Sequence, residues 1–360
     1  MSVNSKKKLV VLTGGGTAGH VMPNLALVPT LESSGYAVQY IGSKGIEENL
    51  AVNAGLEFFR ISSGKLRRYA SWENFIDIFR VLLGVIQSVA LMIRLRPNVV
   101  FSKGGFVSVP VAIAAKLTGV PVVCHESDYT PGLANRIIAK FAKVLLYSFP
   151  ETKAYVNPAK SRYVPSPIRS DLFAGQRDQG LSFCGFQKDG APVLLVMGGS
   201  QGAQRLNEAL LAALPTIIKQ YRVIHLTGKG KAIDFSHPHY KQFEFIGDEI
   251  KHIYAATDFV VCRAGANSIF EMLALHKPML LIPLEVGSRG DQILNAKSFV
   301  SKGWAHILME STLTVDGLID AVGALANDKS AIMQRQCQVN LREGGRQIVM
   351  ILEEVMSSQS

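Results

Sequence analysis

The sequence predicts an α/β protein made of two Rossmann-like domains whose parallel sheets face each other across a cleft. Three observations predict this fold. Short apolar runs alternate with helical segments along the chain, which is typical of parallel sheets covered by helices. A glycine-rich segment follows the first apolar run of each half, at residues 14–19 and 198–203. The length of 360 residues exceeds that of one ordinary domain.

Apolar runs and helical periodicity assign the elements in order. In the first half, strands are predicted at residues 9–12, 38–41, 99–101, 120–124 and 144–147, and helices at 24–31, 75–95 and 107–117. In the second half, strands are predicted at 193–197, 223–226, 243–246, 259–262 and 279–282, and helices at 206–219, 268–275 and 292–302.

The domains are expected at residues 1–166 and 167–339. Pro165 and Pro167 make the segment between them an extended, stiff connector. A final helix at about residues 340–360 is expected to pack back on the first domain.

Composition narrows the class of protein. Apolar residues make up 48% of the chain and charged residues 18%, which suits a folded protein with a large core. The four cysteines form no CxxC pair, and Cys124 and Cys262 lie in apolar runs, so we expect buried thiols in a reducing compartment. The basic N-terminus lacks the long apolar run of a signal peptide.

Positive charge is confined to the first half. Residues 1–168 hold 19 Lys and Arg against 9 Asp and Glu, whereas residues 169–360 hold 19 of each. A one-sided basic surface suits nucleic acid, anionic lipid or a phosphorylated ligand, although a merely solvated basic face is equally compatible with it. Nucleic acid is disfavoured because the basic half lacks interleaved aromatics or a recognition motif.

The first glycine segment predicts a site for a negatively charged ligand. Glycines between a strand and a helix let backbone N–H groups approach an anion, which the helix dipole also favours. The spacing Gly14-x-Gly16-x-x-Gly19 also fits a dinucleotide fingerprint. That site needs an acid at the end of the second strand, and Glu47 and Glu48 come several residues too late. A nicotinamide cofactor is therefore disfavoured.

Three loops of the first half together predict a diphosphate pocket. They are residues 14–20, 102–108 and 125–132, each of which follows a predicted strand. In the second half, Ser268-x-x-Glu271 begins a helix. It is either a capping box or a ribose site in which Glu271 accepts both hydroxyls beside a bound diphosphate, and spacing alone leaves both open.

The motifs as a set resemble the MurG family of peripheral-membrane N-acetylglucosaminyltransferases of bacterial peptidoglycan synthesis. They are Gly14-Gly-Gly-Thr-Ala-Gly-His20, Lys103-Gly-Gly-Phe-Val-Ser108, His125-Glu126, Gly198-Gly-Ser-Gln-Gly-Ala203, Arg263-Ala-Gly-Ala266 and Asp291-Gln292. The resemblance implies a GT-B fold. It also implies inverting transfer from UDP-N-acetylglucosamine to the lipid-linked muramyl-pentapeptide (lipid I), which gives lipid II, and partners among cell-wall and division proteins.

The resemblance also implies residue roles. UDP-N-acetylglucosamine would be bound by Thr17, Ala18, Gly19, Asp128, Arg169, Ser200, Ile246, Ala266, Asn267, Ser268, Glu271, Asp291 and Gln292. The acceptor diphosphate would face Gly15, Gly16, Lys103, Gly104 and Gly105. The family's usual Gln-Asn after His-Glu is here Ser127-Asp128, so the contact with the donor sugar is expected to differ.

The chemistry is expected to need neither a metal nor another cofactor. The sequence contains no Asp-x-Asp metal motif, and the helix N-terminus of the second domain with Arg169 and Ser200 can balance the leaving diphosphate. His20 is the leading general base, since a helix N-terminus keeps imidazole neutral, and Glu126 is the rival. Alternatively, His20 only shapes the loop.

A membrane-surface helix is predicted from residue 72 onward. Trp72, Phe75 and Phe79 follow helical spacing and come after Lys65, Arg67 and Arg68. The uncharged run 81–93 is too short to span a bilayer, which takes about 20 residues. The alternative is an ordinary helix packed on its sheet. With the resemblance, this helix implies an anionic membrane partner and a place at the cytoplasmic face of the bacterial plasma membrane.

Two other functions stay open. A UDP-N-acetylglucosamine 2-epimerase shares the GT-B architecture but needs no lipid and no basic face. A non-catalytic nucleotide-sugar sensor is disfavoured by the presence of His20, Glu271 and Gln292.

Overall fold

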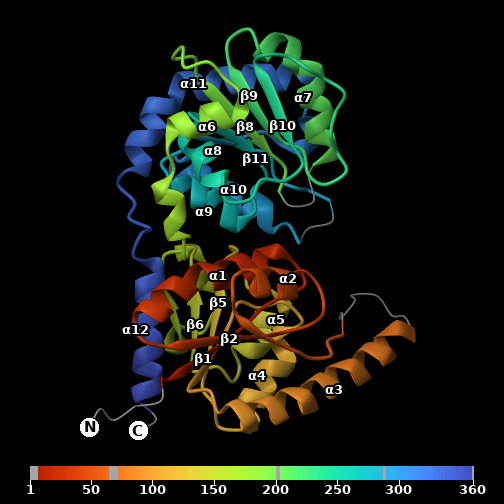
Figure 1. The fold of residues 1–360 in the computed structure, drawn as a ribbon, viewed down its shortest axis with the longest axis vertical. Coiled ribbons are helices and arrows are strands. Elements are labelled where there is room, and N and C mark those ends of the chain that lie inside the picture. The colour runs from red at the N-terminus through yellow and green to blue at the C-terminus, as the bar shows by residue number, and fades with distance from the viewer. Residues whose placement is uncertain (1–6, 65–71, 200–202, 287–288, 359–360) are drawn as a thin grey trace. The chain divides into compact units, whose positions relative to one another are not determined.

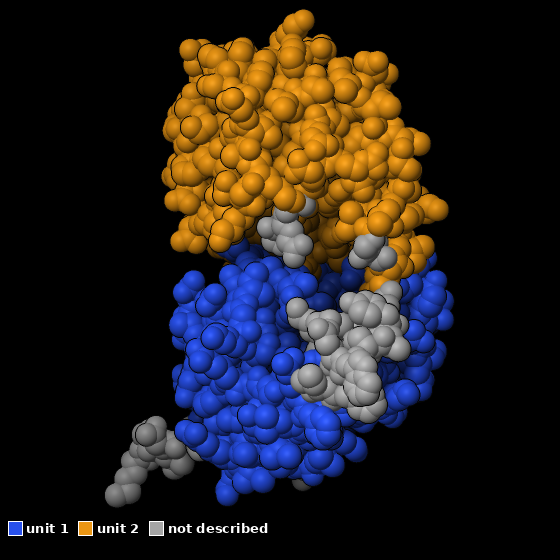
Figure 2. All heavy atoms as spheres, turned by 90° about the vertical axis from the view of Figure 1, so that its right-hand side faces the viewer, with its two compact units in different colours: residues 1–169, 342–360 blue, residues 170–341 orange. Residues whose placement is uncertain are grey.

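The computed structural model describes residues 7–64, 72–199, 203–286 and 289–358, with the backbone alone for residues 72–76. The chain forms two compact units, which Figure 2 distinguishes by colour. Unit 1 comprises residues 1–169 and 342–360, and unit 2 comprises residues 170–341. The boundary between the units falls between Arg169 and Ser170. The boundary predicted from the sequence lies three residues earlier, between residues 166 and 167.

Unit 1 is built on a parallel sheet, shown in Figure 1. Among the described residues the sheet has seven strands in the order β3-β2-β1-β4-β5-β6-β7. The strands are β1 (Leu9–Thr13), β2 (Ala37–Gly42), β3 (Glu57–Arg60), β4 (Val99–Ser102), β5 (Val122–Glu126), β6 (Val144–Tyr147) and β7 (Ser161–Tyr163). β1, β4 and β5 are buried along almost their whole length, as expected of strands covered on both faces.

Helices cover both faces of this sheet. They are α1 (Ala18–Ser33), α2 (Ile46–Asn53), α3 (Trp72–Leu95), α4 (Ser108–Leu117), α5 (Leu133–Ile138) and α12 (Gly344–Ser357), with short 3₁₀ helices η1 (Pro150–Tyr155) and η2 (Pro158–Lys160). Along β1 the side chains alternate between two cores. Val10 and Leu12 pack in the core formed with α1 and α12, whereas Val11 packs in the core formed with α4 and α5.

Unit 2 repeats the plan. Across its described residues a six-stranded parallel sheet has the order β10-β9-β8-β11-β12-β13. The strands are β8 (Val193–Met197), β9 (Arg222–Leu226), β10 (Tyr240–Phe243), β11 (Phe259–Cys262), β12 (Met279–Leu281) and β13 (Ala305–Ile307). The helices are η3 (Ser170–Ala174), α6 (Arg177–Cys184), α7 (Gln204–Ile217), α8 (Ile250–Ala256), α9 (Ala266–Ala274), α10 (Asp291–Ser301), η4 (Glu310–Thr312) and α11 (Val315–Gln336).

One predicted strand is displaced, and three strands were not predicted. The run 243–246 was expected as a strand, but β10 ends at Phe243, because Tyr240–Phe243 pair with Val223–Leu226 of β9. The strands that were missed, β3, β7 and β13, are three or four residues long and lie at sheet edges. The prediction that Cys124 and Cys262 are buried free thiols is confirmed.

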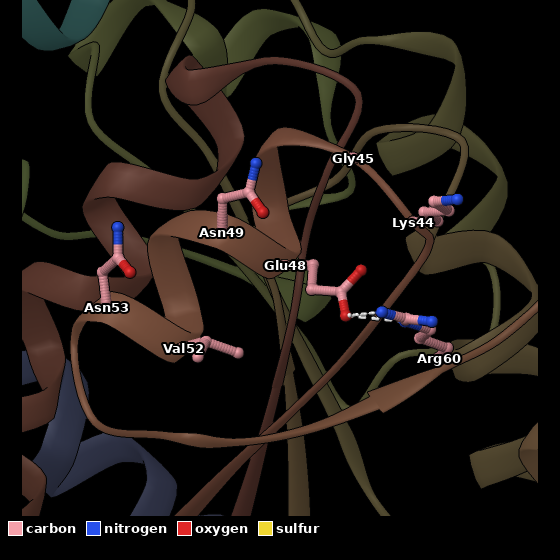
Figure 3. Close-up of a pocket in the computed structure, with 7 residues that line it drawn as sticks. All are labelled: Lys44, Gly45, Glu48, Asn49, Val52, Asn53 and Arg60. Carbon is pink, nitrogen blue, oxygen red and sulfur yellow. Dashed lines mark hydrogen bonds and ion pairs between the residues drawn. The ribbon is translucent and has the colours of Figure 1, made fainter.

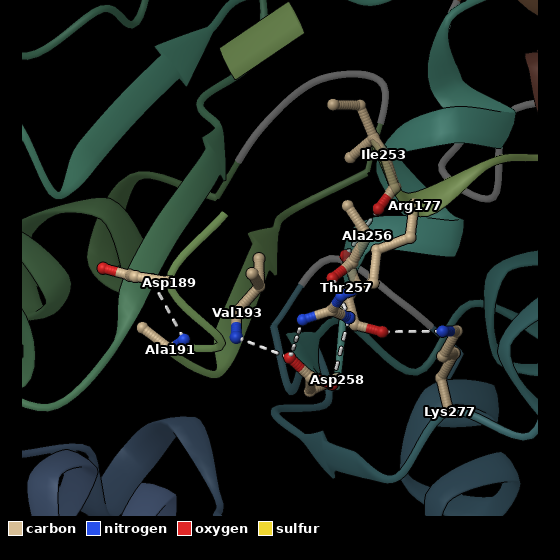
Figure 4. A network of polar contacts seen from close by, with 9 residues as sticks. All are labelled: Arg177, Asp189, Ala191, Val193, Ile253, Ala256, Thr257, Asp258 and Lys277. Atoms are coloured by element: carbon tan, nitrogen blue, oxygen red, sulfur yellow. Dashed lines mark hydrogen bonds and ion pairs between the residues drawn. The ribbon is translucent and has the colours of Figure 1, made fainter. Parts of the chain in front are cut away.

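A polar network ties unit 2 together where β8 and β11 begin (Figure 4). The Asp258 carboxylate accepts from both terminal nitrogens of Arg177, at 3.2 and 3.0 Å, and from the Val193 backbone N–H at 2.7 Å. Lys277 Nζ donates to the Thr257 carbonyl at 2.6 Å. The network joins α6 to both strands at the sheet edge opposite the glycine loops, so it is structural.

Candidate active site

The glycine loops follow the strands at which each sheet reverses its order. In unit 1 the order reverses between β1 and β4, which precede the loops at Gly14 and Lys103. In unit 2 it reverses between β8 and β11, which precede the loops at Gly198 and Arg263. Open α/β sheets bind ligands outside the carboxyl ends of strands at such a switch point. The topology therefore places one candidate site on each unit.

The two glycine loops of unit 1 touch each other. A Cβ added to Gly105, which has a φ of +81°, would overlap the carbonyl oxygen of Gly15. A Cβ on Gly14 would lie 3.1 Å from the Lys103 Cβ and 2.7 Å from the His20 carbonyl oxygen. Glycine is required here because the backbones approach too closely for a side chain. The loops predicted to act together are thus in direct contact.

Lys103 lies beneath these loops, not on their surface. Its side chain is buried, and Nζ hydrogen-bonds His125 Nδ1 and donates to Ser127 Oγ at 2.6 Å. Burial lowers the pKa of Lys103 to about 7, and the nearby carboxylates of Glu126 and Asp128 oppose that shift. The predicted contact between Lys103 and the acceptor diphosphate does not fit this placement, because protein encloses the amine.

His125 is a buried neutral link in the same cluster. Burial, followed by the charge of Lys103, holds the pKa of His125 well below its usual value. Its Nε2 lies 3.0 Å from Ser148 Oγ. Since the neutral ring accepts from Lys103 at Nδ1, its Nε2–H donates to Ser148. His125 therefore connects β5 with β6 inside the domain.

Glu126 anchors the loop that follows β5. Its carboxylate accepts from the Asp128 N–H at 3.0 Å, from the Gly132 N–H at 2.8 Å and from Asn135 Nδ2 at 2.9 Å. Three donors on a buried carboxylate use most of its lone pairs. This arrangement makes Glu126 a loop anchor and favours His20 as the base.

His20 lies in the first turn of α1, directly after the glycine loop. The ring is partly exposed, and its Nδ1 lies 3.1 Å from Thr17 Oγ1. Gly16, Thr17 and Gly19 beside it are exposed. This is the part of the loop that can meet a substrate.

Glu47, which the sequence pattern excludes as a ribose ligand, contacts the glycine loop in the structure. The side chain is buried, although the position follows an exposed turn. Its Oε2 accepts the Gly16 N–H at 3.3 Å. The available signal was an acid in the first helical turn after Gly45, close enough to fold back over the neighbouring loop.

The unit 2 candidates gather around the starts of α9 and α10. Ala266 to Glu271 form the first turns of α9, and Tyr254 Oη donates to Glu271 Oε2 at 3.5 Å. Arg263 is buried, pairs with Glu310 and donates to the Ile282 carbonyl at 3.2 Å, so it supports the loop from below. Asn295 Nδ2 donates to the Ala264 carbonyl at 3.1 Å, which joins α10 to the same loop.

The remaining residues predicted to bind the donor differ in burial and in partners. Asp291 is buried and pairs with Arg289 at 2.7 Å, and Gln292 Oε1 accepts the Leu284 N–H at 2.9 Å. Ile246 is buried in the loop after β10. Arg169 is half-buried at the end of the first segment of unit 1.

Several predicted positions lie outside the described residues. They are Ser200, Lys65, Arg67 and Arg68, together with the side chains of Trp72 and Phe75.

α3 has one packed face and one bare apolar face. The helix packs on α4, with Gly84, Ser88 and Met92 buried. The exposed large apolar side chains are those of Ile78, Phe79, Leu82, Leu83, Ile86 and Ile93. The segment Asp77–Leu95 has a mean hydropathy of 1.9 and is long enough to cross a membrane by length and composition. Its inner face holds Asp77 and Ser88 buried against the domain.

A shallow hollow of about 320 Å³ lies on the outer side of α2 (Figure 3). It is lined by Lys44, Glu48, Asn49, Asn53 and Arg60 among others. Glu48 points toward Arg60 and pairs with it at 2.6 Å. The neighbouring Glu47 instead accepts from the Gly16 N–H, so the two adjacent glutamates contact different segments.

Among the described residues, no group of three or more His, Cys, Asp or Glu side chains is arranged to hold a metal ion.

Two Rossmann-like units, each with a parallel sheet and glycine loops at its switch point, have the GT-B architecture, and the family models assign the chain to the glycosyltransferases. Residues 10–146 match the glycosyltransferase family 28 N-terminal domain, and residues 193–347 match its C-terminal domain. A solved structure of Acinetobacter baumannii MurG shares the fold with a TM-score of 0.75 at 24% identity, covering 97% of this chain and 100% of that one.

Two bacterial relatives are much closer in sequence. The chain is 48% identical to a Lachnoclostridium phytofermentans protein, covering 97% of this chain and 99% of the relative. It is 51% identical to a Geobacillus thermodenitrificans protein, covering 90% and 92%. Both are named UDP-N-acetylglucosamine--N-acetylmuramyl-(pentapeptide) pyrophosphoryl-undecaprenol N-acetylglucosamine transferase. The chain belongs to glycosyltransferase family 28 and, within it, to the MurG family.

Proposed function

We propose that this chain transfers N-acetylglucosamine from UDP-N-acetylglucosamine to the muramyl sugar of undecaprenyl-diphosphate-linked muramyl-pentapeptide, giving lipid II. The observation that carries the proposal is 48–51% identity over nearly the whole chain to relatives named for this reaction. The alternative 2-epimerase shares only the architecture, so the transferase is favoured.

The reaction is a single inverting displacement. The acceptor hydroxyl oxygen forms a bond to the anomeric carbon as the bond from that carbon to UDP breaks on the opposite face. His20 takes the hydroxyl proton, and UDP leaves with the bonding electron pair. The partial exposure of His20 beside the exposed end of the glycine loop supports this role, as does the use of the Glu126 carboxylate by three N–H donors.

Unit 2 holds the nucleotide in this proposal. The first turn of α9 receives the leaving diphosphate, because its N–H groups and dipole favour negative charge, and Arg169 and Ser200 assist it. Glu271 takes the ribose hydroxyls, Ile246 pairs with uracil through its backbone, and Gln292 with Asp291 lies at the sugar. Such charge compensation needs no metal ion.

Unit 1 holds the acceptor at a membrane surface. The bare face of α3, which includes Phe79, Leu82 and Ile86, supports docking on lipid, and the excess of basic residues in the first half supports attraction to anionic headgroups. We therefore place the enzyme at the cytoplasmic face of the plasma membrane, where a lipid-linked acceptor is reached without crossing the bilayer.

One assay separates the alternatives. The protein is incubated with labelled UDP-N-acetylglucosamine and a short-chain lipid I analogue in the presence of EDTA. A disaccharide-lipid product supports both the transfer and its independence of metal. Product formation only after Mg²⁺ is restored would overturn the metal-free mechanism, and formation of UDP-N-acetylmannosamine would favour the epimerase.

A further inference from the structure

Glu47 is a buried carboxylate that the chemistry described above does not use. It stands in the first turn of α2, and its side chain is 2% exposed. Its two oxygens are held by different segments, since Oε2 accepts the Gly16 N–H at 3.3 Å and Oε1 accepts from Ser43 Oγ at 2.5 Å. A carboxylate withdrawn from water requires such partners.

Two glycines, Gly15 and Gly42, leave room for this side chain. A Cβ on Gly15 would lie 2.7 Å from Glu47 Oε1, and one on Gly42 would lie 3.1 Å from its Cγ. The loops after β1 and β2 are therefore shaped around the same carboxylate.

The hydrogen bond between the Gly16 N–H and Glu47 lies on the inner side of the glycine loop. A Cβ on Gly16, whose φ is +85°, would meet nothing within 4 Å, so the outer side of the loop is open. Glycine segments have the largest backbone entropy to lose on ordering. The partly buried hydrogen bond from the Gly16 N–H to Glu47 restrains that freedom one residue before Thr17 and leaves the outer face of the loop to substrate.

From this geometry we propose that Glu47 is a positioning residue, which holds the 14–20 loop so that His20 meets the acceptor hydroxyl. A further consequence is that the Gly16 N–H is bonded to Glu47, so the acceptor diphosphate lies against the exposed end of the loop toward Gly19 instead. The inference rests on the proposed transferase activity, with His20 as its base.

The test compares Glu47→Ala and Glu47→Gln with Glu48→Ala as the matched control. Glu48 is the next residue of the same helix, but it pairs with Arg60 in the hollow of Figure 3. We expect Glu47→Ala to lower kcat by about 10²-fold, the scale of a small misplacement of reacting groups, with donor KM changed less than about threefold. Glu47→Gln keeps one acceptor and should fall between, and Glu48→Ala should stay within about twofold.

A double-variant cycle separates positioning from general damage. If Glu47 acts through His20, adding Glu47→Ala to His20→Ala lowers kcat by no more than about twofold further. If the double variant loses kcat by the product of the two single-variant factors, the proposal is overturned. A wild-type kcat in Glu47→Ala would also overturn it. Thermal unfolding checks the fold, and if Glu47→Ala does not fold, the isosteric Glu47→Gln carries the cycle.

Amide hydrogen exchange tests the positioning role of Glu47 without relying on catalytic activity. Amide exchange across residues 14–20 is expected to rise at least about tenfold in Glu47→Ala and to stay unchanged in Glu48→Ala. An inactive wild-type protein would sink the transferase proposal while leaving this readout intact. Unchanged exchange in Glu47→Ala would sink the positioning role even in an active enzyme.

Discussion

His20 and His125 both belong to motifs of the predicted site in unit 1, yet they differ in burial. His125 is fully enclosed, and its two ring nitrogens bond Lys103 and Ser148. His20 is partly exposed and contacts Thr17 at one ring nitrogen. A base must reach solvent and substrate, so only His20 meets the geometric requirement.

His20→Ala is predicted to lower kcat by roughly 10²-fold or more, the scale of losing a general base. Affinity for UDP-N-acetylglucosamine, measured by calorimetry, should stay within about threefold, because the nucleotide is assigned to unit 2. Near-normal turnover at unchanged donor affinity would remove His20 from the role.

Lys103 is predicted to make stability depend on pH. Burial lowers its pKa from 10.5 to about 7, so between these values the unfolded chain binds more protons than the folded one. The free energy of unfolding attributable to Lys103 therefore rises as pH rises from about 7 toward 10. Lys103→Met lacks this contribution. The free energy of unfolding measured with denaturant should therefore rise more steeply with pH in the wild type than in Lys103→Met across this range.

The control for that measurement is Lys44→Met, because Lys44 is an exposed lysine of the same unit. Its pH dependence should parallel the wild type. Parallel curves for Lys103→Met as well would show that the buried amine is not proton-linked to folding.

At the scale of elements, α3 combines a packed face with an apolar face that nothing covers among the described residues of unit 1. Phe79, Leu82 and Ile86 are 71%, 54% and 67% exposed. Burying such side chains in lipid is worth about 1.5–3 kcal/mol each. The helix is therefore suited to hold the enzyme on a membrane.

Replacing Phe79, Leu82 and Ile86 together by serine is predicted to weaken binding to anionic vesicles by at least about 10²-fold. The melting temperature should hardly change, because these side chains lie on the outer face. Met350→Ser is the control, since Met350 is likewise exposed, at 60%, but lies on α12 and not on α3. Equal co-sedimentation of the triple variant and the control would rule out docking through α3.

At the scale of the whole molecule, the end of the chain returns to unit 1. Ile348, Val349 and Leu352 of α12 are buried in the same core as Val10 and Leu12 of β1. α12 therefore completes the core around β1, and unit 1 cannot form this core before α12 has been synthesised.

Truncation after Leu341 is predicted to unfold unit 1. Each large aliphatic side chain lost from a core costs about 2–5 kcal/mol, so losing several exceeds the usual stability of about 5–15 kcal/mol. Hydrogen exchange should then show full exposure of β1 and β4 with protection retained in β8 and β11. Deleting only residues 358–360 is the control. Retained protection of β1 in the long truncation would contradict the prediction.

Sequence patterns were strong enough to predict the central strands and the family. The apolar runs of β1, β4, β8 and β11 predicted the parallel sheets and the glycine loops that follow these strands, since strands buried on both faces are apolar throughout. The strand order, which puts these loops at the switch points, came from the tertiary structure. The edge strands β3, β7 and β13 were beyond such patterns, because pairing with a neighbour defines them more than composition does.

The sequence by itself therefore determined the fold class, the MurG family membership and the glycine loops that follow the central strands. Only the tertiary structure decided what each charged side chain does there. Lys103 lies buried against His125, Glu126 anchors its own loop, and Glu47 holds Gly16. The physical reason is that burial and hydrogen-bond partners arise between segments distant in sequence, and no local pattern records them.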